Sequence, residues 1–207
     1  MKNVEDYRNM ILTIVGDAAG RRYSEDMLKL GLLEALDEYR DYCPRVVPQQ
    51  LPVLSVTNGR VISFPDYGPD ETDIIYIKNP GGEYYVNYTI FYNYSKEKIE
   101  VTLRYNDMIP QPGQTLDVGI SVPHYIRGLD GKTITTVPDR HMRTVCKGAA
   151  AAAMKVRARS VTEVFGKRPE DREALTTQAD AMHAEFLKEL KQLAKQESLL
   201  RDPWGRI

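Results

Sequence analysis

The side chains that most often carry catalysis are scattered through this sequence. His183 has no second histidine four positions further on, so it does not match a zinc-binding helix. His141 lies in the first turn of a predicted helix, whose positive end disfavours protonation, and we expect a capping or surface role. His124 is expected in a loop, and none of these histidines lies in a recognisable serine-triad context. The sequence therefore predicts neither a metal site nor a catalytic residue.

Acidic and glycine-rich segments were candidates for cation and phosphate binding. A group of carboxylates could hold a hard cation, but it lacks the spacing of a calcium loop: Asp66, Asp70, Glu71 and Asp73. We expect a solvated acidic loop there. Pro80-Gly81-Gly82 and Pro112-Gly113 are turn sequences and do not match a phosphate-binding loop. These patterns predict a protein that is not an enzyme and that needs no cofactor.

Tyrosines are concentrated in a predicted strand over residues 84–94, which places Tyr84, Tyr88 and Tyr92 on one face. Aromatic rings of this kind can stack on carbohydrates or nucleic-acid bases. Tyrosine is also an ordinary strand residue, so packing in a core or an interface is the favoured interpretation. A ligand-binding or hydrolytic β domain remains an alternative.

The most distinctive stretch is alanine-rich and basic, and it predicts one long helix over residues 138–165. Gly148 and the run Ala149–Ala153 form a small face against which other helices can pack closely. The same helix carries candidates for a subunit interface or a DNA channel: Arg143, Lys147, Lys155, Arg157 and Arg159. Their positive charges could contact phosphate or pair with the acidic N-terminal helices of the same or an adjacent subunit, and we favour the pairing.

The remaining elements surround this helix in sequence. Helical periodicity predicts two acidic N-terminal helices, the second capped by Ser24 and stopped by Pro44, and a last helix that begins at Pro169. Between them, Pro48 and Pro52 predict a linker, and alternating segments predict about five to seven antiparallel strands, including 60–64, 73–78, 98–105, 116–122 and 132–137.

The predicted fold class is therefore α+β, a helical bundle of N- and C-terminal helices with an inserted antiparallel β block. The expected divisions are a helical hairpin over 1–45, a β domain over 46–138, closing helices over 139–198 and a tail arm over 199–207. Candidate docking residues in that arm are Leu199, Leu200, Trp204 and Ile207.

Whole-chain properties limit the class of protein. The chain has 207 residues, a net charge of −1 and two cysteines, Cys43 and Cys146. This is enough chain for a full core and too few cysteines for a disulfide framework, so both cysteines are expected to be reduced core residues in a cytoplasmic setting. No apolar leader and no apolar run of about 18 residues is present, so neither secretion nor membrane insertion is expected.

The order of elements resembles that of head-to-tail connector, or adaptor, proteins of tailed bacteriophages. The matching segments are Tyr23–Tyr39 followed by Pro44, then a β block, then Gly148–Met154 with its arginines, and a closing helix containing Phe186–Leu190. The β block is larger here than in the all-helical adaptors.

The resemblance implies a structural virion protein that is assembled in the host cytoplasm. It implies a homo-oligomeric ring, commonly of twelve subunits, that sits on the portal protein and links the capsid to the next tail or stopper component. Double-stranded DNA would pass non-specifically through the channel, and the C-terminal arm would dock on the portal. A nucleic-acid-binding module that uses the basic helix at 140–159 is the alternative that the residues leave open.

Overall fold

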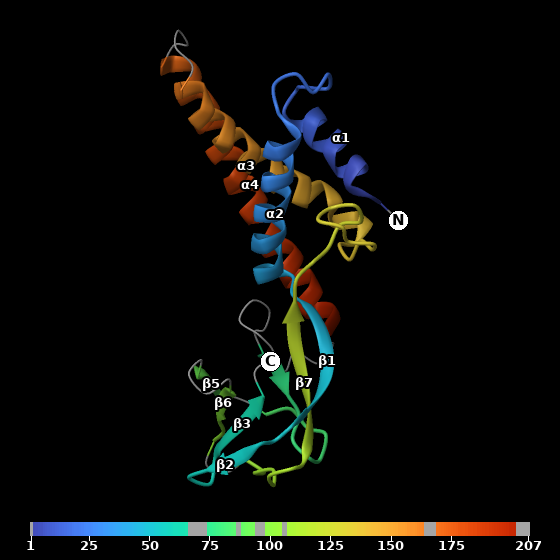
Figure 1. Ribbon diagram of the computed structural model, residues 1–207, viewed down its shortest axis with the longest axis vertical. Coiled ribbons are helices and arrows are strands. Elements are labelled where there is room, and N and C mark those ends of the chain that lie inside the picture. The colour runs from blue at the N-terminus through green and yellow to red at the C-terminus, as the bar shows by residue number, and fades with distance from the viewer. Residues whose placement is uncertain are drawn as a thin grey trace. The chain divides into compact units, whose positions relative to one another are not determined.

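A computed structural model of the chain describes residues 2–65, 74–85, 88–93, 98–104, 107–163 and 169–201. It divides into two compact units, a helical unit formed by Met1–Pro44 with Pro123–Ile207 and a β unit formed by Arg45–Val122 (Figure 1). The predicted α+β class, with an antiparallel β block inserted between N- and C-terminal helices, is confirmed. The sequence predicted that the β domain ends at residue 138. In the structure the β unit ends at Val122.

In its described residues the helical unit has the α-helices α1 (Val4–Ile14), α2 (Glu25–Tyr42), α3 (Met142–Glu163) and α4 (Pro169–Arg201). A short 3₁₀ helix, η2 (Asp139–His141), directly precedes α3. Polar caps define the first two starts. Asn3 and Asp6 form a reciprocal capping box on α1, and the hydroxyl of Ser24 accepts the backbone N–H of Met27 at the start of α2. The N-cap predicted at Ser24 is confirmed.

The segment before α3 differs from the prediction. Residues 132–137 were expected to form a strand, but they form a loop that packs in the helical unit. Backbone and side-chain groups both hold this loop: the N–H of Thr136 donates to the carbonyl of Tyr125 at 2.9 Å, Thr136 Oγ1 accepts the N–H of Tyr125 at 2.8 Å, and Thr135 Oγ1 accepts the N–H of Arg127 at 2.9 Å. Thr135 also donates to the carbonyl of Lys2 at 2.6 Å, which ties this loop to the start of α1.

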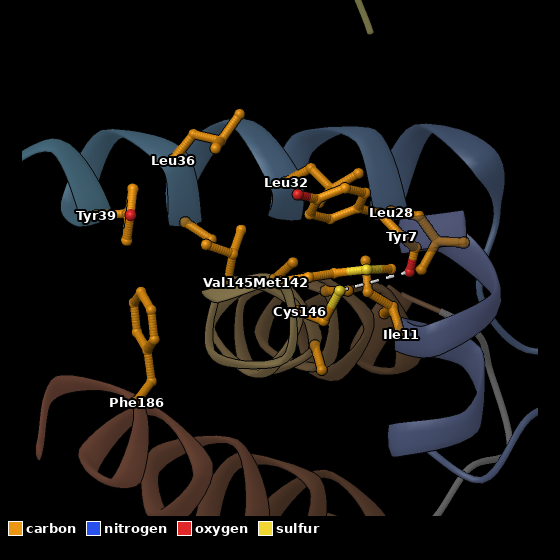
Figure 2. Packing of buried hydrophobic residues seen from close by; sticks show 14 of the residues in the cluster. Tyr7, Ile11, Leu28, Leu32, Leu36, Tyr39, Met142, Val145, Cys146 and Phe186 are labelled. Atoms are coloured by element: carbon orange, nitrogen blue, oxygen red, sulfur yellow. Dashed lines mark hydrogen bonds between the residues drawn. The ribbon is translucent and has the colours of Figure 1, made fainter. Parts of the chain in front are cut away.

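The core of the helical unit is built around α3, which contacts α1, α2 and α4. Figure 2 shows side chains of α1 and α2 meeting α3 on one side while Phe186 of α4 approaches from another. The largest fully buried side chains in this core are Tyr7, Ile11, Leu32, Tyr39 and Phe186. Burial of each such side chain stabilises the fold by roughly 1.5–3 kcal/mol before entropy is counted.

In the described part of the β unit, seven strands form two antiparallel sheets. The first sheet has the order β1-β7-β4, with β1 (Arg45–Pro52), β7 (Thr115–Val122) and β4 (Ile74–Ile77). The second has the order β2-β3-β6-β5, with β2 (Ser55–Thr57), β3 (Val61–Pro65), β6 (Lys98–Thr102) and β5 (Thr89–Asn93). The inward residues of both sheets form a core of their own, which includes Leu51, Ile62, Phe64, Ile99 and Leu116.

Two β-unit predictions are wrong. The segment with Pro48 and Pro52 is not a linker, because it forms β1 and pairs along its whole length with β7, from Arg45 opposite Val122 to Pro52 opposite Thr115. Proline is tolerated there because β1 is an edge strand, whose outer N–H groups need no ladder partner. In the described residues of the predicted long strand over 84–94, a strand is formed at Thr89–Asn93, and Tyr84 makes an isolated bridge with Lys78.

Candidate functional site

The alanine run of α3 is a packing element. Ala149, Ala150, Ala151 and Ala153 have no exposed surface, and Ala152 is 5% exposed, so this part of α3 is enclosed by its neighbours. A helix with small side chains on more than one face allows other helices to approach it closely. The predicted role of this run as the packing surface of the central helix is therefore confirmed.

Two glycines mark the closest approaches to α3. A Cβ atom added to Gly31 of α2 would lie 2.5 Å from the carbonyl oxygen of Ala149, closer than any real Cβ contact. A Cβ atom added to Gly148 of α3 would lie 2.7 Å from the ring of Phe186 on α4. The packing of α3 against α2 and against α4 thus requires a glycine at each contact, because a larger residue would push the helices apart. These contacts fix the positions of α2 and α4 against α3.

The lysines of α3 pair with α4. Lys147 Nζ lies 2.5 Å from Glu189 Oε1 and 3.2 Å from Glu185 Oε2, and Lys155 Nζ lies 3.3 Å from Asp180 Oδ1. The expected partners were the acidic N-terminal helices of the same or an adjacent subunit. Within this chain the carboxylates of the closing helix pair with these lysines instead. Two candidate residues for DNA contact therefore already have anionic partners.

The Lys147–Glu189 pair is a partly buried hydrogen-bonded unit. Thr144 Oγ1 also donates to Glu189 Oε2 at 2.9 Å. Partial burial would raise the pKa of the Glu189 carboxyl, but hydrogen bonds from Lys147 and Thr144 outweigh it and hold the pKa below its usual range. The hydrogen bond to Glu189 likewise raises the pKa of Lys147. The pair stays fully charged at neutral pH.

The three arginine candidates on α3 have different surroundings. Arg143 and Arg159 are exposed, and Arg157 places its guanidinium carbon 4.9 Å from the ring centroid of Tyr23. This stacking gives Arg157 a structural role in holding the α1–α2 connection against α3. A role of these arginines in subunit contact or in a DNA channel stays a prediction.

The tail candidates are only partly described. Leu199 and Leu200 lie in the last turn of α4, which continues to Arg201, and so they do not belong to an extended arm. Trp204 and Ile207 lie outside the described residues, as does the acidic group at Asp66, Asp70, Glu71 and Asp73. The predicted functions of both segments are untested by the structure.

His141 is buried, contrary to the prediction of a capping or surface role. It is 2% exposed, and its Nδ1 lies 2.6 Å from the phenolic oxygen of Tyr39 on α2. Arg140 Nε donates to His141 Nε2 at 3.1 Å. Because that arginine nitrogen can only donate, Nε2 of the neutral ring accepts, and the proton on Nδ1 points to Tyr39. Position in the sequence gave no signal of this bond.

The other histidines also connect helices. His124 Nε2 donates to the carbonyl oxygen of Cys43 at 2.9 Å, and its ring packs edge-on against Tyr39 at 4.8 Å between centroids. His183 of α4 lies 2.9 Å from a carboxylate oxygen of Glu38 on α2. Within the described ranges, no group of three or more histidine, cysteine, aspartate or glutamate side chains is arranged to hold a metal ion.

The two cysteines are buried and carry no disulfide, as predicted. Cys146 lies in the core of α3, where its sulfur contacts the carbonyl oxygen of Tyr7 at 3.7 Å (Figure 2). Burial raises the pKa of the Cys146 thiol to about 12, so the thiol stays protonated and unreactive. Neither cysteine is placed as a nucleophile.

The tyrosines of the β unit make a small aromatic group. Tyr76 and Tyr84 pack edge to face with 5.2 Å between ring centroids, and Lys78 Nζ lies 5.3 Å from the centroid of Tyr84. Tyr84 is 59% exposed, whereas Tyr85 is buried and donates a hydrogen bond to the carbonyl of Met108. The Tyr76 ring lies directly over Gly119, which has no side chain to obstruct it. Of the alternating tyrosines expected on one face, Tyr92 lies in β5, whereas Tyr84 lies in the isolated bridge with Lys78.

An apolar strip is exposed on α2 of the helical unit. Leu30 is 55% exposed and Leu33 is 37% exposed, although both belong to an otherwise acidic helix face. Leu33 also borders an open groove of about 190 Å³, whose other apolar walls include Leu36, Pro123, Ile126 and Leu129. Exposed leucines next to an apolar groove are typical of a protein-binding surface. Sequence periodicity alone places Leu30 and Leu33 on the outer face of the helix, and this was the signal that could have identified them.

Comparisons with known proteins add no assignment. No protein-family model matches the chain, and no curated protein matches it. In the part of the chain that is described, no helix combines the length and apolar character needed to cross a bilayer. The helical unit offers a charged surface with an exposed apolar strip on α2.

Proposed function

We propose that this protein is a structural assembly subunit, a head-to-tail connector of a tailed bacteriophage. In this role the chain forms a ring on the portal protein, links the capsid to the next tail component, and lets double-stranded DNA pass through the central channel. The proposal includes no catalytic step. It places the protein in the virion after assembly in the host cytoplasm.

The observation that carries the proposal is the exposure of Leu30 and Leu33 on the acidic outer face of α2. Leaving two leucines in water disfavours a solitary subunit, whereas burying them in a contact contributes roughly 25 cal/mol for each Å² of apolar surface removed. Surrounding carboxylates make that contact selective for a basic partner surface. A self-associating structural protein can bury such a strip in its subunit contact.

The interior of the helical unit supports the same proposal. Its buried histidines are used in hydrogen bonds between segments, and its cysteines are buried core residues. The Gly31 and Gly148 contacts hold α2, α3 and α4 in tight register. A unit that is rigid in this way can present its outer helix faces in fixed geometry, which closure of a ring requires.

Light scattering on the purified chain tests the proposal, first alone over a range of concentrations and then with the portal ring. The expected result is a defined oligomer, or a defined increase in mass when the portal is present. A chain that stays a monomer at every concentration and never joins the portal ring would contradict the proposed function.

The alternative, a nucleic-acid-binding module on α3, has weaker support. Lys147 and Lys155 are engaged by α4 carboxylates, which leaves Arg143 and Arg159 as the exposed basic side chains among the candidates on α3. If these arginines contact DNA phosphates, Arg143→Glu with Arg159→Glu will abolish retention of duplex DNA at low salt. Retention that is unchanged in this variant would remove α3 from any DNA contact.

A further inference from the structure

The outward face of α2 carries a regular stripe. Asp26, Leu30, Leu33 and Asp37 follow one another at steps of four, three and four residues, which brings them onto one side of the helix. All four are exposed, as are the neighbouring acids Glu34 and Asp41. We call this set of residues the α2 stripe. It consists of two leucines with carboxylates on both sides.

The outward face of α4 carries a second stripe with the same spacing. Its residues are all exposed and follow the same alternation of four and three: Thr177, Ala181, Ala184, Lys188 and Lys191. We call this set the α4 stripe. Lys188 and Lys191 form no ion pair with any described residue, in contrast to Lys147 and Lys155 on α3. The α4 stripe therefore has small side chains in its N-terminal part and lysines in its C-terminal part.

The two stripes match in size and in charge. If the helices lie side by side in the same direction, Leu30 and Leu33 fall opposite Ala181 and Ala184, where small side chains leave room for leucines. In the same register Asp37 falls opposite Lys188, and Asp41 falls within reach of Lys191. The alternation of four and three residues on both helices is the spacing of helices that pack at a small crossing angle.

Within one chain both stripes are exposed, and the direct contact between α2 and α4, Glu38 with His183, lies outside both of them. Both α2 and α4 use their inner faces to pack against α3, with Leu32 and Phe186 buried there, so their stripes point away from this shared neighbour. Within the helical unit α2 and α4 also run in the same direction (Figure 1). Rotation about an axis along these helices keeps α4 of a neighbouring copy parallel to α2, as the register above requires.

From this match we infer that a second copy of this chain binds through its α4 stripe to the α2 stripe of the first. The inference rests on the proposed ring function and specifies its subunit contact. The contact joins two different faces, so each subunit keeps one free stripe after pairing. Contacts of this kind propagate from copy to copy and close into a ring when the rotation between copies permits.

Charge reversal on each stripe tests the contact. The α2 variant is Asp37→Lys with Asp41→Lys, near the C-terminal end of a helix where cations are tolerated. The α4 variant is Lys188→Glu with Lys191→Glu. A control variant in the β unit, Glu83→Lys with Glu100→Lys, raises the net charge by the same amount as the α2 variant does. Circular dichroism and thermal melting establish that each variant is folded.

The expected result is that each stripe variant loses self-association by at least about tenfold while the control assembles as the wild type does. In an equimolar mixture of the two stripe variants, a contact between identical chains brings four lysines or four acids together, whereas a contact between different chains pairs opposite charges in either orientation. Mixing the two variants should therefore also restore assembly, through chains that alternate. A chain carrying both reversals restores opposite charges across every contact, so it regains assembly.

Three results would overturn the inference. If wild type assembles and both stripe variants assemble equally well, the contact lies elsewhere and only this inference fails. If both variants lose assembly but the chain with both reversals does not regain it, the stripes do not face each other. A wild type that is monomeric at all concentrations and with the portal overturns this inference together with the proposed function. Leu30→Gln provides a second α2 variant should charge reversal impair folding.

Discussion

The phenolic oxygen of Tyr39 lies 2.6 Å from Nδ1 of His141, and this buried hydrogen bond joins α2 to the turn that begins α3. Tyr39 is 1% exposed, so water cannot replace the bond if one partner is removed. Tyr39→Phe leaves the imidazole N–H without this acceptor inside the core. We expect the free energy of unfolding to fall by about 1–3 kcal/mol, measured by urea denaturation. An unchanged midpoint and slope would show that the bond contributes nothing net.

Tyr7 is the matched control for this change. Its ring is fully buried against α3, but its hydroxyl has no hydrogen-bond partner in the described residues, and burial raises the pKa of this phenol. Tyr7→Phe removes a polar group that loses its hydration on folding. We expect unfolding free energy to stay the same or to rise by up to about 1 kcal/mol. A loss comparable to that of Tyr39→Phe would reveal a partner for the hydroxyl.

Gly31→Ala tests the close approach of α2 to α3. In an isolated helix this change stabilises by about 1 kcal/mol, because alanine has the higher helix propensity. Here the added methyl group would lie 2.5 Å from the Ala149 carbonyl, so the backbones must separate. We expect net destabilisation of roughly 1–3 kcal/mol in chemical denaturation. Gln178→Gly is the control, at an exposed position of α4 outside the α4 stripe, with an expected loss of up to about 1 kcal/mol from propensity alone.

Lys147→Met tests the ion pair between α3 and α4. We expect a loss of roughly 0.5–1.5 kcal/mol at neutral pH, since the pair is partly exposed and water screens it. The folded-state pKa of Glu189 is lowered, so its stabilising contribution is present above the unfolded pKa of about 4.3 and disappears as pH falls through the folded value. The difference in stability between wild type and variant should therefore shrink in acid below about pH 4.

Denaturation followed at several pH values measures this difference. Lys155→Met is the comparison variant, because its ion pair with Asp180 is longer, at 3.3 Å, and more exposed. It should cost less stability at neutral pH. A Lys147→Met deficit that stays constant between pH 7 and pH 3 would mean that lost packing of the lysine stem, and not the charge on Glu189, causes the effect.

Cys146 should react only when the helical unit opens. Its thiol has a pKa of about 12 and no exposed surface, so at pH 8 it presents neither thiolate nor access to a reagent. In a Cys43→Ala background, the rate of modification by an aromatic disulfide should follow the unfolding equilibrium as urea is added. Rapid modification in the absence of denaturant would contradict the buried position of Cys146.

Patterns along the chain were sufficient to predict the class of fold and much of the local structure. Ser24 was identifiable as an N-cap because a hydroxyl followed by two acids and an apolar periodicity satisfies the helix start without help from other elements. The small face at Gly148–Ala153 likewise indicated close helix packing, since alanine and glycine leave room for a neighbour wherever that neighbour comes from. Such features depend on residues a few positions apart.

Strand pairing, burial and side-chain partners depend on residues far apart in the sequence, and they became visible in the three-dimensional structure alone. Pro48 and Pro52 indicated a linker until pairing with β7 placed them on an edge strand, where proline costs little. His141 looked like a surface residue because its partner, Tyr39, is 102 positions away, and Lys147 could not be assigned to Glu189 for the same reason. Local periodicity fixes which face of a helix is apolar, whereas burial, hydrogen-bond partners and ion pairs are set by whichever segment the fold brings opposite it.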